Sequence, residues 1–145
     1  MKQLFKFCAA AMMVGAVGIV AAADGAPVTN AARSEFVTAK KTHFSRKGQA
    51  YYIVGANFWY GGYLGAPSGV GERARLLKEL DTMKATGINN LRVLAVSEKT
   101  AMKSAVSPAT TAKPGEYDEN LLVGLDYLMA EAAKRDMTVV LYLNN

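Results

Sequence analysis

The chain has 145 residues, a formal net charge of +5, one cysteine (Cys8) and one histidine (His43). Its basic residues are dispersed among acids, with one modest cluster between residues 40 and 47. Nucleic-acid-binding proteins usually carry a basic face or stripe, so this balance indicates ordinary surface solvation and no nucleic-acid partner. With one histidine, the chain can assemble neither a Ser-His-Asp triad nor a histidine metal cluster.

Residues 1–23 predict a secretory signal peptide. Lys2 and Lys6 precede an apolar run from Phe7 to Val20 that ends in a stretch of three alanines. The competing interpretation is a membrane anchor, but the run is at the short limit for spanning a bilayer and is rich in Ala and Gly. We therefore expect cleavage after Ala23, secretion to the periplasm or the extracellular space, and no membrane contact of the mature chain.

Cleavage would remove the only cysteine, so the mature chain could form no disulfide bond. Small secreted domains commonly depend on disulfides, and a cysteine-free one is expected to depend on a large hydrophobic core instead. Residues 24–34, composed mainly of Ala, Gly, Pro, Asn and Thr without apolar periodicity, predict a flexible leader.

The first structured elements are predicted to be β-strands. Short segments flank Lys40-Lys41 and predict a hairpin from Phe36 to Phe44, with a second turn at residues 46–49. Residues 51–57 are almost continuously apolar or aromatic, which predicts a strand buried on both faces, as in parallel sheets. A glycine-rich aromatic loop follows at residues 58–65.

Two helices then alternate with two more strands. The spacing of Leu76, Leu80 and Met83 predicts a helix over residues 72–86, which Gly87 ends. Residues 88–96 predict a second buried strand, followed by a long polar loop at residues 97–117.

Asp118 is a plausible N-cap for a second helix at residues 119–135, and residues 137–145 predict a third buried strand. Two βαβ units predict an α/β fold with a parallel sheet. Because a strand that is apolar on both faces is a poor edge, we expect the sequence to be a truncated or fragmentary form of a longer chain.

Polar residues collect where the predicted strands end. Asn57 closes the first strand, Arg92 lies within the second, and Asn144 and Asn145 close the third. The longest connections also follow strands. In parallel α/β folds, sites are built at the carboxyl ends of the strands, so we expect the working face there.

Arg92 is the most informative single residue, because a guanidinium among Leu, Val and Ala must be paired if it is buried. It could hold a carboxylate at the centre of a site and keep it ionised. Equally, it could form a structural salt bridge. The residue pattern of the strand does not distinguish the site role of Arg92 from the structural salt bridge.

Three aromatic residues in the loop after the first strand, Trp59, Tyr60 and Tyr63, could stack on sugars or pack the loop onto the core. The loop glycines form no dinucleotide fingerprint, so no nicotinamide cofactor is expected. Glu98 could contact substrate or cap its loop. Because no nucleophile stands beside a base, we expect no catalytic residue within the chain, and neither a metal nor an organic cofactor.

Several segments are similar to a known family: residues 51–60 (YYIVGANFWY), 87–94 (GINNLRVL) and 139–145 (VVLYLNN). Together with residues 79–81, 117–119 and 124–126, they resemble the start of bacterial β-mannanases of glycoside hydrolase family 5. The resemblance covers about residues 35–145. It implies a (β/α)8 TIM barrel, of which the chain would hold the first three strands and two helices, with the N-terminal hairpin plugging the bottom.

The resemblance also implies an activity of the full-length parent, the endo-acting, retaining hydrolysis of internal β-1,4-mannosidic bonds. Retaining enzymes use two carboxylates about 5–5.5 Å apart, and both glutamates would lie beyond residue 145. By resemblance, Arg92 matches the arginine that contacts the nucleophile, and Trp59 and Tyr60 match the loop lining the sugar subsites. Asn57 and Asn144 are expected to support the site, and the expected partner is β-mannan or a related β-1,4-glycan.

Two alternatives remain open from the sequence. A β-1,4-glucanase can use the same barrel, since the loops that distinguish mannan from cellulose would lie beyond residue 145. The chain could also be a non-catalytic module that keeps the aromatic loop and binds β-glycans without cutting them.

Overall fold

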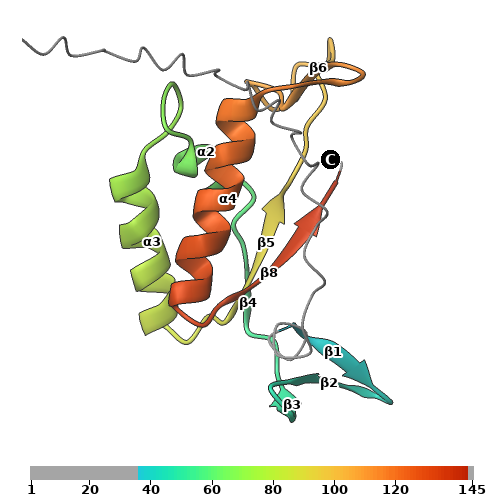
Figure 1. Ribbon diagram of the computed structural model, residues 1–145, viewed down its shortest axis with the longest axis vertical. Helices are drawn as coiled ribbons and strands as arrows, with labels where there is room; N and C mark the ends of the chain where they lie inside the picture. Colours follow the sequence, from blue (N-terminus) through green and yellow to red (C-terminus); the bar gives the residue numbers. More distant parts are fainter. Residues whose placement is uncertain (1–35, 144–145) are drawn as a thin grey trace, which may run out of the picture.

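The computed structural model describes residues 36–143 (Figure 1). The predicted signal peptide, the predicted leader, Asn144 and Asn145 lie outside these residues. The elements in chain order are β1 (Thr38–Lys40), β2 (His43–Arg46), β3 (Gln49–Tyr51), β4 (Gly55–Asn57), α2 (Gly61–Gly65), α3 (Arg73–Ala85), β5 (Asn90–Leu94), β6 (Thr111–Lys113), β7 (Glu116–Tyr117), α4 (Glu119–Lys134) and β8 (Thr138–Tyr142).

The central element is a parallel sheet with strand order β4-β5-β8. Arg92 pairs with Asn57 on β4 and with Val140 on β8, while Leu94 pairs with Tyr142. Helices α3 and α4 lie together on one side of this sheet (Figure 1). Two successive βαβ units therefore build the sheet, which confirms the predicted α/β class.

Both long helices lie where the apolar spacing predicted them. Leu76 and Leu80 of α3 are fully buried, and Gly87 follows the helix with φ of 88°, a conformation that glycine adopts readily at a helix C-terminus. At the start of α4, the carboxylate of Asp118 accepts a hydrogen bond of 3.3 Å from the backbone N–H of Leu121. The predicted N-cap is confirmed.

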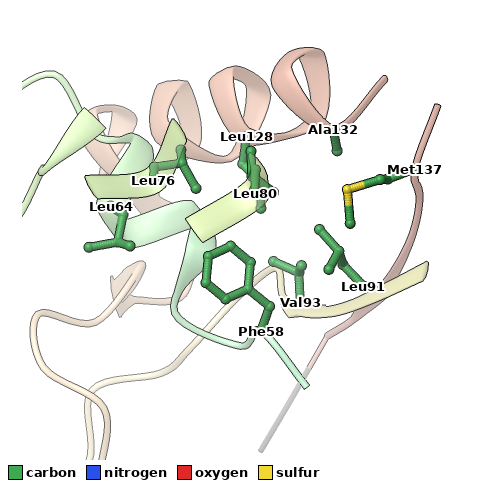
Figure 2. Close-up of a cluster of buried hydrophobic side chains, with 9 residues drawn as sticks. All are labelled: Phe58, Leu64, Leu76, Leu80, Leu91, Val93, Leu128, Ala132 and Met137. Atoms are coloured by element: carbon green, nitrogen blue, oxygen red, sulfur yellow. The ribbon is translucent and has the colours of Figure 1, made fainter. Parts of the chain in front are cut away.

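The hydrophobic core fills the space between the helices and the sheet (Figure 2). Each fully buried leucine contributes about 1.5–3 kcal/mol relative to an exposed one. The core side chains are Phe58, Leu64, Leu76, Leu80, Leu91, Val93, Leu128, Ala132 and Met137. Phe58, Leu91 and Val93 come from the sheet side and meet α3 and α4, so one face of the sheet is sealed.

The prediction of one buried parallel strand over residues 51–57 is wrong. Tyr51 belongs to β3, and β4 begins only at Gly55. Between them, the side-chain amide of Asn89 donates to the carbonyl of Tyr52 (2.8 Å) and accepts from the backbone N–H of Val54 (2.9 Å). These bonds replace a strand ladder, and Tyr52 is left 79% exposed.

The third predicted strand is left as an edge of the sheet, and within the described residues it is covered on one face only. Val139 packs against the core, but Val140 is 50% exposed and Leu141 is 38% exposed. The physical reason is that helices cover only one face, and β8 is an edge of the sheet.

The predicted N-terminal hairpin is confirmed and is extended by β3 into an antiparallel sheet of order β1-β2-β3. It lies at the amino-terminal end of the parallel strands (Figure 1). Arg46 and Lys47 each form an ion pair of 3.0 Å with Asp136 in the turn before β8. These ion pairs join the hairpin to the end of the parallel sheet opposite the predicted site.

The two connections predicted as irregular loops contain short elements. The loop after β4 forms α2, which packs on α4; a Cβ atom on Gly65 would collide with the carbonyl of Gly124. The loop after β5 contains the hairpin β6–β7. At the base of this loop, the backbone N–H of Ser97 donates a hydrogen bond of 3.4 Å to Oγ1 of Thr110.

Candidate functional site

The face of the parallel sheet that α3 and α4 leave uncovered is the candidate site, and we call it the free face. Residues that pair in register across parallel strands point to the same side, so Asn57, Arg92 and Val140 form one row on it. All three are exposed, whereas Leu91 and Val93, which alternate with Arg92, are fully buried in the core. The strand pattern therefore directs Arg92 to the free face.

Arg92 is held by two uncharged partners. Its Nη1 donates to Oδ1 of Asn57 at 3.3 Å, and its Cζ lies 3.6 Å from the ring centroid of Tyr142. No carboxylate among residues 36–143 pairs with it, so the structural salt bridge considered from the sequence is absent from this region. Most of the five N–H donors of the guanidinium have no protein acceptor in the same region, and they can bind a carboxylate or sugar oxygens.

Trp59 lies just past β4, at the carboxyl end of the sheet. Its carbonyl accepts a hydrogen bond of 3.3 Å from the backbone N–H of Leu94, which ends β5. Its side chain is 38% exposed and meets the Tyr63 ring edge to face at 6.3 Å. The Tyr63 hydroxyl in turn shares a hydrogen bond of 2.8 Å with the Ser97 hydroxyl, so one neighbour of the indole is fixed while the indole itself stays partly exposed to a ligand.

Tyr60 packs edge to face beside Trp59, with the ring centroids 5.5 Å apart, but its hydroxyl is directed toward α3. Its hydroxyl donates to Glu79 on α3 at 2.9 Å, and its ring packs edge to face on Phe58 at 4.8 Å. Burial, followed by the hydrogen bond to Glu79, raises the pKa of Tyr60 above its usual range. The Tyr60 hydroxyl is therefore tied to α3, and Trp59 presents the more exposed of the two neighbouring rings.

The acids near this end of the sheet have local roles. Asp118 is the cap of α4, and Glu116 pairs with Lys113 at 3.6 Å. Glu98 is exposed and its backbone forms a parallel bridge with Thr111. Asn144, the remaining predicted site residue, lies outside the described residues.

Within residues 36–143, no group of three or more His, Cys, Asp or Glu side chains could hold a metal ion. No helix in the described part of the chain is long and apolar enough to cross a membrane.

Tyr142 is the site residue that the sequence reasoning missed. It lies two residues after Val140 and so shares the free face with Arg92. The period-two spacing of a strand carried this signal, but it becomes readable only when the register between β5 and β8 is known.

Comparison with known proteins agrees with this geometry. Residues 34–145 match a family model described as GH family 5 beta-mannosidase-like. The crystal structure of a glycoside hydrolase family 5 mannosidase from Rhizomucor miehei is 41% identical, with a TM-score of 0.69, over 74% of this chain and 27% of that one. The described residues are thus an open, three-stranded segment of a TIM-barrel fold.

Two mannan endo-1,4-β-mannosidases are also similar to the chain. Mannan endo-1,4-β-mannosidase 1 from Oryza sativa subsp. japonica is 32% identical over 74% of this chain and 23% of that protein. Its namesake from Solanum lycopersicum is 29% identical over 79% of this chain and 27% of that protein. The chain spans no more than 30% of the length of the curated relatives it matches.

The bacterial origin that the resemblance implied stays a prediction. The family model matches most of the chain, including every strand of the parallel sheet. The chain belongs to glycoside hydrolase family 5, with mannosidases as its relatives.

Proposed function

We propose that the chain forms the first part of the barrel of a secreted enzyme that hydrolyses β-1,4-mannosidic bonds in mannan-type polysaccharides. The observation that carries the proposal is the free face, where Arg92 lies between Asn57 and Tyr142 at the carboxyl end of the sheet. This arrangement occurs in a chain that is 41% identical to a family 5 mannosidase.

The roles of the residues follow from their chemistry. The planar fork of Arg92 suits a carboxylate and keeps it ionised, as a nucleophile in a retaining mechanism requires. The exposed indole of Trp59 suits the C–H face of a sugar ring. The two catalytic glutamates would come from barrel strands beyond this chain, so residues 1–145 alone are expected to be inactive. Secretion through the predicted signal peptide would bring the enzyme to its polysaccharide.

The names of the relatives favour mannan over cellulose as the substrate, because the curated matches are mannan endo-1,4-β-mannosidases. The glucanase alternative has no such support. A second candidate is a β-mannosidase that releases sugar from chain ends, since the higher identity of 41% is to a protein titled a mannosidase.

A chimera tests the proposal. Residues 36–143 would replace the matching segment of the Rhizomucor miehei mannosidase, which supplies the rest of the barrel. The chimera should hydrolyse β-mannosides, and its Arg92→Ala variant should be at least about 100-fold slower, because a preorganised charge at the reacting centre is removed. A folded chimera whose activity does not depend on Arg92 would refute the assignment of the free face.

The complete reading frame tests two points directly: whether the chain is part of a family 5 glycosidase, and whether that enzyme cuts internal bonds or acts at chain ends. If the proposal holds, the reading frame should encode the two glutamates that the family resemblance implies. The enzyme it encodes should lower the viscosity of galactomannan quickly if it cuts internal bonds, or release mannose without that fall if it acts at chain ends. Faster cleavage of carboxymethylcellulose than of galactomannan would instead support the glucanase.

A further inference from the structure

On the free face, the guanidinium of Arg92 lies over the ring of Tyr142. The guanidinium carbon lies 3.6 Å from the centroid of the Tyr142 ring. Cations interact favourably with aromatic faces within about 6 Å, and arginine also stacks through its planar group. This contact therefore lies well inside the attractive range.

The register of the sheet explains how the two side chains meet. Arg92 pairs with Val140, and Tyr142 lies two residues further along β8 on the same face. Tyr142 thus lies nearer than Val140 to the carboxyl ends of the strands, the end of the sheet where Trp59 lies.

The two partners of Arg92 restrict different motions. The face of the Tyr142 ring, in contact with the planar guanidinium, restricts the tilt of the guanidinium plane. The hydrogen bond from Nη1 to Asn57 Oδ1, at 3.3 Å, fixes the rotation within that plane. A long arginine side chain on an exposed strand face would otherwise sample many rotamers, so the two contacts together define where the remaining N–H groups point.

We propose that Tyr142 is a positioning residue for Arg92, holding the guanidinium in the orientation in which its free N–H groups face a ligand above the sheet. The proposal rests on the proposed function, in which the free face is the glycosidase site. The π-face of the ring does the work, because the Tyr142 hydroxyl has no hydrogen-bond partner among residues 36–143. Phenylalanine should therefore replace tyrosine, and leucine should not.

The first test needs no catalysis and uses the 145-residue chain itself. Side-chain NMR of the arginines should show the Arg92 methylene and Nε–H protons shifted upfield by the ring current of Tyr142. Tyr142→Phe should keep the shift and Tyr142→Leu should abolish it, with unchanged unfolding midpoints showing that both variants are folded. An Arg92 spectrum without a ring-current shift, or one that is the same in Tyr142→Leu, would overturn the proposal.

The second test uses the chimera with the Rhizomucor miehei mannosidase. Tyr142→Phe should keep kcat within about twofold, whereas Tyr142→Leu should lower kcat about tenfold, the upper part of the range for a desolvated cation–π contact. In an Arg92→Lys background, which has no planar fork, Tyr142→Leu should have no further effect. Additive effects of the two substitutions would show that Tyr142 does not act through Arg92.

The two tests also separate this inference from the proposed function. An inactive wild-type chimera that still shows the Tyr142-dependent shift of Arg92 would count against the glycosidase assignment and leave the contact established. An active chimera in which Tyr142→Leu behaves as the wild type would refute the positioning role and leave the glycosidase assignment intact.

Discussion

The contact between α2 and α4 offers a sharp test of the fold, because it depends on glycine. A Cβ atom at Gly124 would lie 2.5 Å from the backbone N and 2.8 Å from the Cα of Ala66, where ordinary contacts begin at 3.4 Å. Both atoms belong to backbone and cannot rotate away. The carbonyl oxygen of Gly62 would lie closer still, so Gly124→Ala requires α4 to retreat from α2 by about 1 Å.

The expected cost combines two opposing effects. Overpacking in a closely packed interior costs about 1–3 kcal/mol, and fixed backbone atoms place this site at the upper end. Alanine in a helix interior regains about 1 kcal/mol relative to glycine. We therefore expect Gly124→Ala to lower the free energy of unfolding by about 2 kcal/mol.

Gly62→Ala is the matched control. Its added Cβ would meet Leu125 at 3.4 Å from Cδ1 and 3.6 Å from Cα, which are ordinary contacts. The substitution should be neutral or stabilising by up to about 1 kcal/mol. Urea unfolding followed by circular dichroism measures both variants under the same conditions.

The intrinsic fluorescence provides a second signal, because Trp59 is the only tryptophan and its loop leads into α2. Gly124→Ala should change the emission of Trp59 in the folded state, and Gly62→Ala should not. A Gly124→Ala variant as stable as the wild type, with unchanged emission, would refute the close packing of the two helices.

Three further substitutions test the charged and polar contacts. The hydrogen bond from Lys47, in the β2–β3 turn, lowers the pKa of Asp136. The ionised Asp136 therefore stabilises the fold above its unfolded-state pKa of about 3.9. This stabilisation is lost as the pH falls through the lower folded-state pKa of Asp136. Asp136→Asn should lose about 0.5 kcal/mol at neutral pH and show a weaker acid dependence of unfolding. Arg135→Met should lose about 2 kcal/mol, since it deprives Glu131, whose side chain is only 10% exposed, of a charged hydrogen-bond donor at 2.9 Å. Because burial and Glu79 raise the pKa of Tyr60, ultraviolet titration should find a tyrosine that ionises above the usual range and is lost in Tyr60→Phe.

An exposed ion pair serves as the control for Arg135→Met. Lys113 lies 3.6 Å from Glu116, and its side chain is 74% exposed. Lys113→Met should change the free energy of unfolding by less than about 0.5 kcal/mol. If the two variants lose the same stability, burial does not set the strength of these pairs.

The helices and the order of the elements could be predicted from local patterns. The apolar spacing in α3, the cap at Asp118 and the glycine at position 87 are each visible within a few residues of sequence. The split of the first parallel strand could not be predicted in this way. It depends on Asn89, whose amide binds a backbone segment more than thirty residues earlier in the chain.

The candidate site was predicted in part. Asn57, Arg92 and Trp59 lie at or near strand ends, and parallel sheets place such positions together. The role of Tyr142 depends on the register between two strands, and the direction of Tyr60 depends on Glu79 in the following helix. Both are tertiary relationships that strand and helix periodicity cannot express.

The most direct test of the central claim is the rate at which the chimera hydrolyses a β-mannoside, compared with that of its Arg92→Ala variant. If the free face of the β4-β5-β8 sheet is part of a mannosidase site, kcat/KM should fall by at least about 100-fold in the variant while its unfolding midpoint stays the same. Equal rates in two folded proteins would contradict the claim.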